Sequence, residues 1–397
     1  MKTTRSARIS RMSGRLNVLH VTPSMSPSWG GPAVVASELT TELARKGVRC
    51  EIVTAHGYRV GTGQVPTPDV PVTSFATELP ARFWTGYSRE MTRFMRERTG
   101  SFDLIHVHEI WHYPAFAAFY AARRHKLPYV VTIHGELSDW GLRQKALKKR
   151  LYRLCELDRR LNEAGSLHAI TSTEKEQILK LGYKAPVLIA PNGINPSIFE
   201  ALPSPARFLQ RFPALKGKRV VLFLGRLHLK KGLDILARSF SMIARQFEDA
   251  ILLVAGPDKF GTRENMESIL RSKGLLDRAV FTGLLTGEDK LAAMNYADLF
   301  VLPSHSDVLG IAVMEAMAAR LPVIITSGCE FPEVSERAAG LVVEADDASV
   351  AAAISRLLAD ENLRKRMGQQ GNKLVNERYT WQATADPIVG LYTGLVS

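Results

Sequence analysis

Residues 299–320 read LFVLPSHSDVLGIAVMEAMAAR, in which an apolar run, a polar loop and a helix-forming segment follow one another directly. A short apolar run of this kind is typical of a buried strand. Gly310 precedes the helix-forming part, and the first backbone N–H groups of a helix have no partner within it. Phosphate oxygens bind readily to such groups. The stretch therefore predicts a strand–loop–helix unit with an anion-binding end.

The same alternation continues on both sides of this stretch. Apolar runs predict strands at residues 219–224, 250–255, 279–282, 299–302, 323–325 and 340–343. Apolar residues at helical spacing predict helices at residues 233–245, 263–273, 288–296 and 311–319. Strands that alternate with helices form parallel sheets with crossover helices. Residues 219–380 are therefore expected to form one Rossmann-like domain.

The first half of the chain has the same pattern. It predicts strands at residues 16–22, 49–54, 103–108, 129–133, 166–171 and 187–190, and a helix at residues 33–45. Residues 16–195 are expected to form a second Rossmann-like domain, and the Pro-rich residues 196–218 a linker. Ligands bind beyond the carboxyl ends of the strands in such sheets, so the two domains are expected to face each other across a cleft.

Composition limits the class of protein. A chain of 397 residues is too long for a single hydrophobic core, and a hydrophobic content of 46% is ordinary for globular domains. Three widely separated cysteines, Cys50, Cys155 and Cys329, argue against a disulfide framework or a zinc site. Residues 1–15 are basic, without an acid, and are expected to be a disordered tail. The net charge of +13 favours anionic partners such as phosphorylated molecules, anionic lipids or nucleic acid.

A basic loop, GRLHLKKG, starts at Gly225. Glycine lets the backbone approach a ligand closely, and Arg226 with Lys231 can hold a diphosphate. Asp307 and Glu315 can accept hydrogen bonds from sugar and ribose hydroxyls. Taken singly, each feature has a plainer explanation. The basic loop is consistent with a solvated turn, Asp307 with a turn residue, and Glu315 with an exposed acid on a helix.

Three segments in a fixed order make the pattern specific. They are PNGI at residues 191–194, the loop at residues 225–232, and two acids with seven residues between them, the second of which begins EAMA and is followed by PVI. This order resembles the family-4 retaining glycosyltransferases, over nearly the whole chain. The resemblance implies an α/β protein of GT-B architecture, with two Rossmann-like doubly wound domains. It also implies a C-terminal helix, here residues 381–397, that crosses back to the first domain, with Trp381 as its anchor.

The resemblance implies roles for single residues. Arg226 and Lys231 are expected to bind the donor diphosphate, with Lys230 as an alternative because the lysine is doubled. Glu315 is expected to bind the donor ribose. Asn192, Gly225, Gly310 and Ile311 complete the expected donor-binding residues.

Asp307 departs from the family pattern. The first acid of the pair and the backbone up to Gly310 and Ile311 are expected to hold the transferred sugar, and the family usually has Glu there. The carboxylate of Asp307 lies one methylene further back, so a sugar contact is lost, lengthened or bridged by water. The choice of sugar is therefore expected to depend on this position.

Two elements of the first domain also resemble the family. Gly30 and Gly31, in WGGPAVV at residues 29–35, are expected to approach the donor phosphate and the acceptor. A tight strand-to-helix turn explains these glycines equally well. His134 follows an expected strand and is expected to act near the transferred sugar.

No metal or other cofactor is expected. His106 and His108 share one face of a strand, but no carboxylate or cysteine completes a metal site, so they are interpreted as polar strand-end residues. Glu109 is a weaker candidate for the acceptor site. The chain also lacks an Asp-x-Asp pair, the acidic metal clamp of the other major transferase fold. The resemblance implies a reaction on one sugar face, in which the leaving diphosphate helps to deprotonate the acceptor.

Three other functions compete with transfer. A nicotinamide oxidoreductase would need G-x-G-x-x-G after the first strand, which the sequence WGGP at residues 29–32 does not supply. A sugar-nucleotide epimerase of the same fold is a nearer alternative. A nucleic-acid-binding protein is favoured by the charge alone, without a recognised motif.

Residues 141–161 form an expected basic helix. The segment contains eight Arg and Lys against two acids, and Leu147, Leu151, Leu154 and Leu161 recur at helical spacing. Either this apolar stripe packs on the first domain, or the segment contacts an anionic membrane surface. The expected lipid contacts are Arg143, Lys145, Lys148, Lys149, Arg150 and Arg153.

The substrates and location are inferred from the resemblance. The donor is expected to be a hexose linked to GDP or UDP, and the acceptor a glycan or a lipid-linked glycan in surface polysaccharide biosynthesis. The chain is expected to be cytoplasmic, with peripheral contact to the inner membrane face as the alternative.

Overall fold

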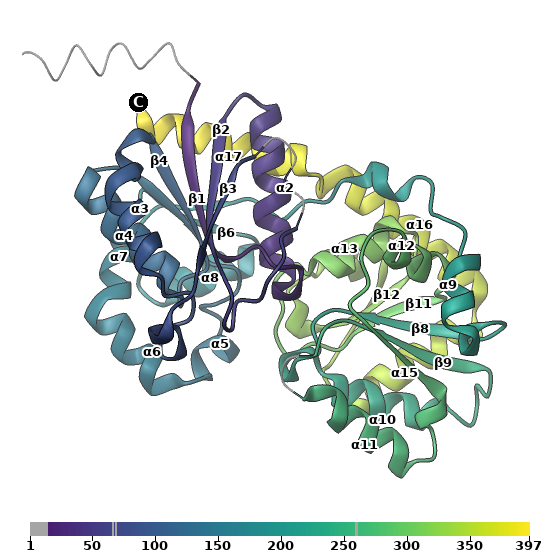
Figure 1. Cartoon of the computed structure of the whole chain (residues 1–397). Coiled ribbons are helices and arrows are strands. Elements are labelled where there is room, and N and C mark those ends of the chain that lie inside the picture. The colour runs from purple at the N-terminus through teal and green to yellow at the C-terminus, as the bar shows by residue number, and fades with distance from the viewer. Residues whose placement is uncertain (1–14, 66, 68–69, 259–260) are drawn as a thin grey trace, which may run out of the picture.

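The structure is a computed structural model that describes residues 15–65, 67, 70–258 and 261–397. The expected tail at residues 1–15 lies outside the described residues, apart from Arg15. The described chain forms two α/β domains, which Figure 1 shows side by side. Two parallel sheets with flanking helices confirm the predicted fold class.

The first domain is built on a parallel sheet. Its described strands are β1 (Asn17–Ser24), β2 (Arg49–His56), β3 (Val72–Ala76), β4 (Leu104–His108), β5 (Tyr129–Thr132), β6 (Ser166–Ala169) and β7 (Val187–Ile189). They lie in the order β3-β2-β1-β4-β5-β6-β7. Periodicity did not predict β3, because this edge strand is short and only partly buried. The order reverses between β1 and β4, which is where doubly wound sheets bind ligands.

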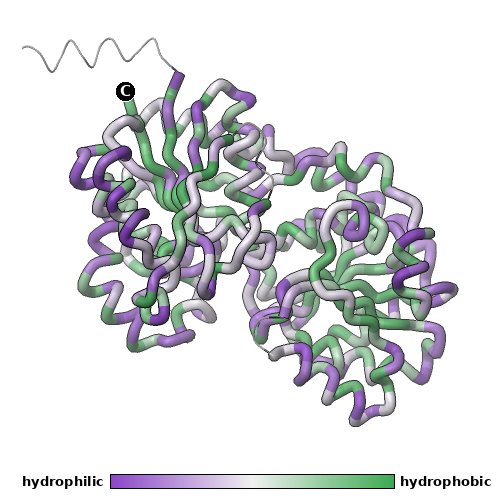
Figure 2. Tube along the Cα trace, viewed as in Figure 1, coloured by the Kyte–Doolittle hydropathy of each residue, from purple (hydrophilic) through white to green (hydrophobic). Residues whose placement is uncertain are grey.

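Helices cover this sheet. They are α2 (Gly31–Arg45), α3 (Arg89–Arg98), α4 (Tyr113–His125), α5 (Asp139–Arg143), α6 (Ala146–Tyr152), α7 (Asp158–Glu163) and α8 (Ser172–Lys180). Figure 2 shows hydrophobic residues along the inner strands and hydrophilic residues on the outer helices. The buried strand side chains form the cores that hold the strand ends in place.

The second domain repeats the plan. Its described strands are β8 (Arg219–Leu224), β9 (Ala250–Ala255), β10 (Ala279–Gly283), β11 (Leu299–Leu302), β12 (Val323–Thr326) and β13 (Gly340–Val343), in the order β10-β9-β8-β11-β12-β13. Its helices are α9 (Ala206–Arg211), α10 (Leu233–Ile243), α11 (Thr262–Ser272), α12 (Gly287–Tyr296), α13 (Ile311–Ala318), α14 (Glu333–Glu336), α15 (Asp347–Ala359) and α16 (Glu361–Arg378). The strand order reverses between β8 and β11, so the second crevice lies at their carboxyl ends.

The C-terminal helix α17 (Trp381–Val396) returns to the first domain, as Figure 1 shows in yellow. Its buried residues Trp381, Ile388 and Tyr392 pack into the core beside α2. The chain also leaves the first domain here. A Cβ atom on Gly193 would lie 2.5 Å from the backbone nitrogen of Trp381, so only glycine fits where the two segments cross.

The segment at residues 196–218 is not a free linker, contrary to the expectation. It contains α9, and Phe199, Phe208 and Leu215 are buried in the core of the second domain. These apolar residues lie in short separate turns, which is why the sequence shows no regular period there. The segment therefore belongs structurally to the second domain.

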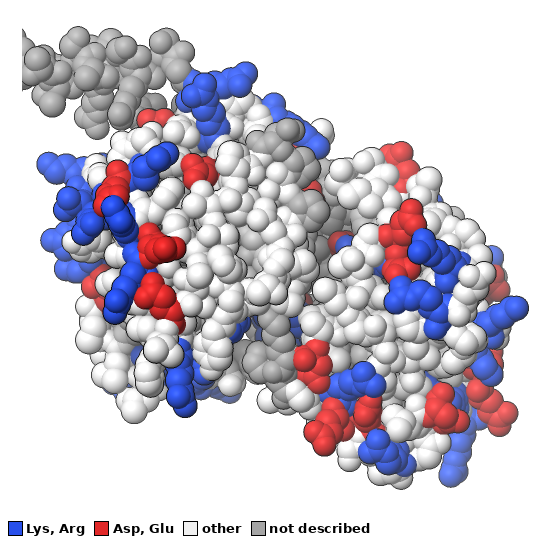
Figure 3. Space-filling view, in the orientation of Figure 1, with Lys and Arg blue, Asp and Glu red and all other residues white. Residues whose placement is uncertain are grey.

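The basic segment at residues 141–161 differs from the expected helix. It is divided into the end of α5, then α6, a π-helical turn at Arg153–Leu157 and α7. Leu161 is buried, but Leu147, Leu151 and Leu154 are 74%, 55% and 70% exposed. The interpretation that these three leucines pack on the first domain is therefore wrong. Figure 3 shows one face of the molecule, on which Lys and Arg gather over the outer helices of the first domain. No helix in the described ranges has the length and apolarity needed to cross a membrane.

Candidate active site

A cavity of about 680 Å³ lies between the two domains, at the carboxyl ends of both sheets. Its wall includes all of the donor and catalytic residues predicted from the sequence. These are Gly30, Gly31, His134, Asn192, Gly225, Arg226, Lys230, Lys231, Asp307, Gly310, Ile311 and Glu315. The fold thus brings together residues that lie up to 285 positions apart between Gly30 and Glu315.

Arg226 reaches from the second domain to the first. A Cβ atom on Gly30 would lie 3.1 Å from Arg226 Nε and 3.2 Å from its Cδ. Gly30 also has a φ of 85°, in the left-handed region that favours glycine. Glycine at this position therefore leaves room for the guanidinium side chain in the cleft.

The lysines after Arg226 lie beside Asp307. Lys231 Nζ donates a hydrogen bond of 2.5 Å to Asp307 Oδ2, and both side chains are mostly buried. Burial alone would raise the pKa of Asp307, but the neighbouring cations, Lys231 first, hold that pKa below its usual value. Burial lowers the pKa of Lys230 to about 8. The cluster therefore has three basic side chains and one carboxylate, which leaves it suited to an anion.

The start of α13 faces the same space. A Cβ atom on Gly310 would lie 2.7 Å from Asp307 Oδ2, so the carboxylate folds over this glycine. One turn further along, Glu315 Oε1 accepts a 2.6 Å hydrogen bond from Lys290 Nζ. Lys290 on α12 also lines the cavity, although no sequence pattern singled it out. Burial, and to a lesser degree Glu315, raise the pKa of Glu38 across the cleft.

The first-domain wall carries two carboxyl groups close together. Trp29 Nε1 donates a 2.8 Å hydrogen bond to Glu109 Oε2, and the Ile110 backbone N–H donates one of 2.5 Å to Glu136 Oε2. Burial raises the pKa of Glu109 to about 7. Burial, and then the charge of Glu109, raise the pKa of Glu136 well above its usual value. The pair therefore retains a proton near neutral pH.

Aromatic and basic side chains surround this pair. Trp111, His112 and Trp140 line the cavity, and Lys149 Nζ lies 4.6 Å from the centroid of the Trp111 ring. Lys149 also donates a 2.6 Å hydrogen bond to the Gly141 carbonyl. The expectation that Lys149 contacts lipid is therefore wrong, because its ammonium group points to the cavity. Of these residues, only Glu109 was considered from the sequence as part of the site.

His134 lies at the end of β5 beside the Asp307 loop. A Cβ atom on Gly135 would lie 2.7 Å from Val308 Cγ2, so the two domains touch here. Glu174 fixes this turn by accepting hydrogen bonds of 2.5 Å from the Gly135 N–H and 2.6 Å from the Ile170 N–H. Burial lowers the pKa of His134 to about 3, so the imidazole is neutral.

His106 and His108 lie in the last three residues of β4, in agreement with their interpretation as strand-end residues, but the sequence did not indicate how deeply they are buried. Both side chains are fully buried in the sheet, and His106 hydrogen-bonds Tyr392 of α17. The alternation of residues in β4 showed that they share a face but could not show that α17 covers it.

Three non-glycine residues in the cavity wall have left-handed backbones. They are Glu109 (φ 64°), His134 (φ 56°) and Leu309 (φ 45°). Such conformations cost about 1–3 kcal/mol each and gather at functional sites. They place backbone strain on three of the loops that line the cavity.

Comparisons with known proteins agree with this geometry. The sequence model of the family described as Glycosyl transferases group 1 matches residues 207–374. The Glycosyl transferase 4-like domain matches residues 30–193. An uncharacterised glycosyltransferase of Methanocaldococcus jannaschii is 25% identical over 91% of this chain and 94% of its own. D-inositol 3-phosphate glycosyltransferase of Kineococcus radiotolerans is 25% identical over 94% of this chain and 93% of its own.

Solved structures share the fold. Sucrose-phosphate synthase from Thermosynechococcus elongatus has a TM-score of 0.77 at 21% identity, over 96% of this chain and 99% of its own. The Anabaena protein HepE, solved in complex with UDP and glucose, has a TM-score of 0.78 at 17% identity, over 96% of this chain and 100% of its own. At this identity the likeness supports the GT-B fold and no more.

Proposed function

The chain belongs to the glycosyl transferases of group 1, and on this premise we propose that it is a retaining hexosyltransferase. It moves a hexose from a UDP- or GDP-linked donor to a glycan or lipid-linked acceptor in surface polysaccharide biosynthesis. The observation that carries this proposal is the cluster of Arg226, Lys230 and Lys231 opposite the start of α13, within one cavity between the domains.

The cluster fits a diphosphate. Arg226 and the two lysines offer charged donors, and the first N–H groups of α13 add uncharged ones. Lys231 is neutralised by Asp307 in the free chain, so a bound diphosphate exchanges that partner for phosphate oxygens. Glu315, held by Lys290, is placed to accept hydrogen bonds from the ribose. HepE was solved with UDP and glucose, which favours UDP-glucose as the first donor to test.

The reaction follows from the charges. The bond between the anomeric carbon and the diphosphate oxygen breaks while the acceptor oxygen bonds to the same face of the sugar. The acceptor proton passes to the leaving diphosphate. Arg226, Lys230 and Lys231 stabilise the negative charge that grows on that group, which is the largest electrostatic contribution such a site offers. His134, on the first-domain wall of the cavity, is proposed to contact the transferred sugar.

The same groups support a proposal about metal ions. Asp307 and Glu315 are the carboxylates nearest the expected diphosphate, and each is paired with a lysine. The cations thus supply the positive charge that a divalent ion would otherwise bring. We propose that transfer needs no metal.

A membrane contact of the acceptor side is also proposed. Leu147, Leu151 and Leu154 point away from the first domain, with exposed cations between them at Lys145, Lys148 and Arg150. Lys148 Nζ donates a 2.8 Å hydrogen bond to the carbonyl of exposed Phe83, which adds a further apolar side chain. Apolar side chains among cations fit an anionic lipid surface, where a lipid-linked acceptor would lie. We call these seven residues the basic surface.

Thermal shift against nucleotide sugars tests the proposal. UDP-glucose or a GDP-hexose is expected to raise the melting temperature equally with and without magnesium, and the Arg226→Ala/Lys231→Ala double variant is expected to lose the shift. The control for the loss of two positive charges is Arg356→Ala/Lys365→Ala, in which both changes lie on the distant helices α15 and α16. Stabilisation by NAD alone would overturn the proposal. An epimerised nucleotide sugar, rather than released diphosphate, would identify an epimerase instead.

A further inference from the structure

Two rows of buried polar side chains lie in the first sheet beneath the cavity. The first row contains Tyr392, His106, Thr132 and His168 and ends at the Ala190 carbonyl. Tyr392 Oη hydrogen-bonds His106 Nδ1. His106 Nε2 lies 2.6 Å from Thr132 Oγ1, which lies 2.8 Å from His168 Nδ1. His168 Nε2 lies 2.8 Å from the Ala190 oxygen.

A single arrangement of protons satisfies this first row. The Ala190 carbonyl only accepts, so His168 donates from Nε2 and accepts at Nδ1. Thr132 then donates to His168 and accepts from His106 Nε2. His106 Nδ1 is left to accept from the Tyr392 hydroxyl. Both rings are neutral because burial lowers their pKa values, that of His168 to about 4.

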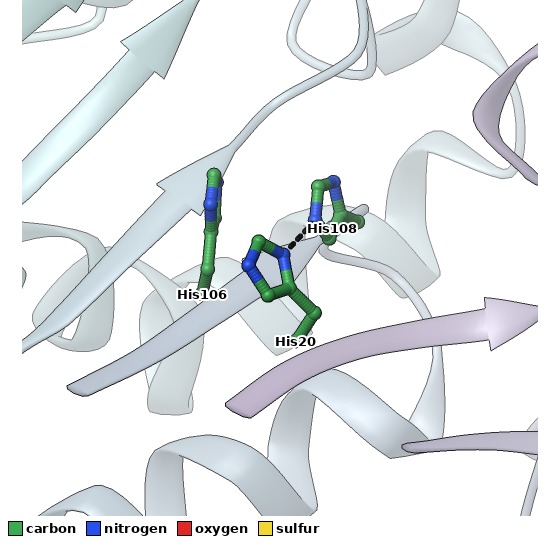
Figure 4. A group of neighbouring side chains, drawn as sticks. All are labelled: His20, His106 and His108. Carbon is green, nitrogen blue, oxygen red and sulfur yellow. Dashed lines mark hydrogen bonds between the residues drawn. The ribbon is translucent and has the colours of Figure 1, made fainter. Parts of the chain in front are cut away.

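The second row leads to the cavity. His20 Nδ1 lies 3.1 Å from His108 Nε2, the contact that Figure 4 shows as a dashed line. His108 Nδ1 lies 3.2 Å from His134 Nε2, and His134 lines the cavity. At the inner end His20 Nε2 is fully buried and has no hydrogen-bond partner among the described residues. This row therefore has no fixed acceptor to set its direction.

Two arrangements of protons are possible in the second row. If His134 donates from Nε2, His108 donates to His20, and His20 keeps a buried N–H without an acceptor. If His20 donates from Nδ1, His108 donates from its Nδ1 to His134, and His20 Nε2 carries an unfilled lone pair. A buried N–H without an acceptor is rarer in proteins than an unfilled acceptor, so the second arrangement is favoured. It places the proton of His134 on Nδ1.

We propose that His108 and His20 are positioning residues that hold His134 as the Nδ1–H tautomer, so that it offers a neutral N–H donor to an oxygen of the bound donor sugar. The inference rests on the proposed function for the identity of the ligand. His134 Nε2 is occupied by His108, so Nδ1 is the ring nitrogen left for a ligand.

The placement and charge of His134 suit a sugar. Its neighbour Gly135 touches Val308, in the loop expected to hold the transferred hexose. Sugar oxygens accept hydrogen bonds, so a ring N–H can donate to any of them. A bare imidazole nitrogen could only accept a hydrogen bond from a sugar hydroxyl. A neutral ring also avoids repelling the positive charge that grows on the sugar during transfer. Burial keeps it neutral, with a pKa of about 3.

Nitrogen-15 NMR of the imidazole rings tests the tautomer directly. The expected result is a protonated Nδ1 and a bare Nε2 for His134, assigned by loss of its signals in His134→Gln. His168 is expected to show the opposite tautomer in the same spectrum, which provides an internal reference. A protonated Nε2 on His134 would overturn the proposal, whether or not the chain binds nucleotide sugars.

Binding of UDP-glucose relative to UDP tests the consequence. His108→Phe keeps an aromatic ring but removes both nitrogens. It is expected to weaken the binding of UDP-glucose about three- to tenfold, the range for one neutral hydrogen bond, with the binding of UDP unchanged. His108→Asn can still donate to His134 and is expected to restore most of the loss. His168→Phe removes an equally buried ring from the first row and is expected to leave the ratio unchanged.

The outcomes separate the two proposals. A normal preference for UDP-glucose over UDP in His108→Phe contradicts the positioning role but leaves transferase function intact. A chain that binds neither ligand contradicts the proposed donor, and the NMR spectrum then still decides the tautomer. Equal loss in His108→Phe and His168→Phe indicates a structural effect of the larger ring on the packing of the sheet, and overturns the specific role of the second row.

Discussion

Replacing Asp307 with Asn removes the carboxylate that neutralises the cluster of Arg226, Lys230 and Lys231. Lys231 and Asp307 are 13% and 14% exposed, so the pair is mostly screened from water. Breaking a buried pair costs about 3–5 kcal/mol, and the open cavity reduces this to about 2–3 kcal/mol. For domains of this size that corresponds to about 4–12 °C in the melting temperature.

The same change is expected to strengthen UDP binding. A diphosphate supplies the negative charge that the Asp307→Asn variant lacks, so the ligand recovers part of the lost stability in the variant and not in the wild type. Recovering about 1.4 kcal/mol corresponds to a tenfold lower Kd. Transfer of the sugar is expected to fall, because Asp307 is the proposed sugar contact. Calorimetric binding of UDP and the melting curve of each form measure both effects.

Matched variants and pH sharpen this test. Asp307→Glu, the family's usual residue, keeps the charge and is expected to stay near wild type. Asp234→Asn removes an equal charge from an exposed pair with Arg238, where the expected cost is below about 1 kcal/mol. The folded pKa of Lys230 is lowered to about 8, so above that pH Lys230 loses its proton and the penalty of Asp307→Asn shrinks. Weaker UDP binding in Asp307→Asn would refute this reasoning, since it would show that Asp307 orients Lys231 for the phosphate.

Three further predictions concern stability and membrane contact. Burial raises the pKa of Glu174 from 4.5 to about 7, so the folded chain binds a proton that the unfolded chain has lost. The free energy of unfolding of the wild type is therefore expected to fall by about 3 kcal/mol as pH rises through that window. Urea unfolding should show a flatter dependence of stability on pH for Glu174→Gln. Gly193→Ala would press a Cβ against the Trp381 backbone and should lower the melting temperature by several degrees, while Gly390→Ala, with open space around it, should not. Changing the three exposed leucines of the basic surface to Ser should weaken co-sedimentation with anionic vesicles at low salt about tenfold, whereas the same change at exposed Leu179 should leave it unaltered.

Periodicity was sufficient for the fold because each strand and helix has its apolar pattern within a few residues. It failed where burial comes from another part of the chain. The edge strand β3 has few buried positions, and the turns around Phe208 bury single aromatic residues without a period. The π-helical turn at Arg153–Leu157 also has no separate signature, so the pattern of residues 141–161 predicts one continuous helix.

The donor half of the site was predictable for the same reason. Gly225, Arg226 and Lys231 are neighbours in one loop, and Asp307 and Glu315 lie in one strand–loop–helix unit. Because these residues are close together in the chain as well as in the fold, a sequence pattern is enough to predict them. Gly30 is the exception, because its role depends on Arg226, which lies 196 positions later and fills the space a side chain would need.

The acceptor half could not be predicted in this way, and the physical reason bears on specificity. Glu109 and His112 lie in the loop after β4 and Glu136 lies in the loop after β5, so the three side chains approach one another only when β4 and β5 pair. Each carboxyl is ordinary in the sequence; burial raises both pKa values, and the charge of Glu109 raises that of Glu136 further. Two neighbouring carboxyl groups of which one is protonated offer both a hydrogen-bond donor and an acceptor to a substrate hydroxyl. The proposed diphosphate site is therefore encoded in short sequence patterns, whereas the proposed acceptor wall depends on contacts that only the folded first domain creates.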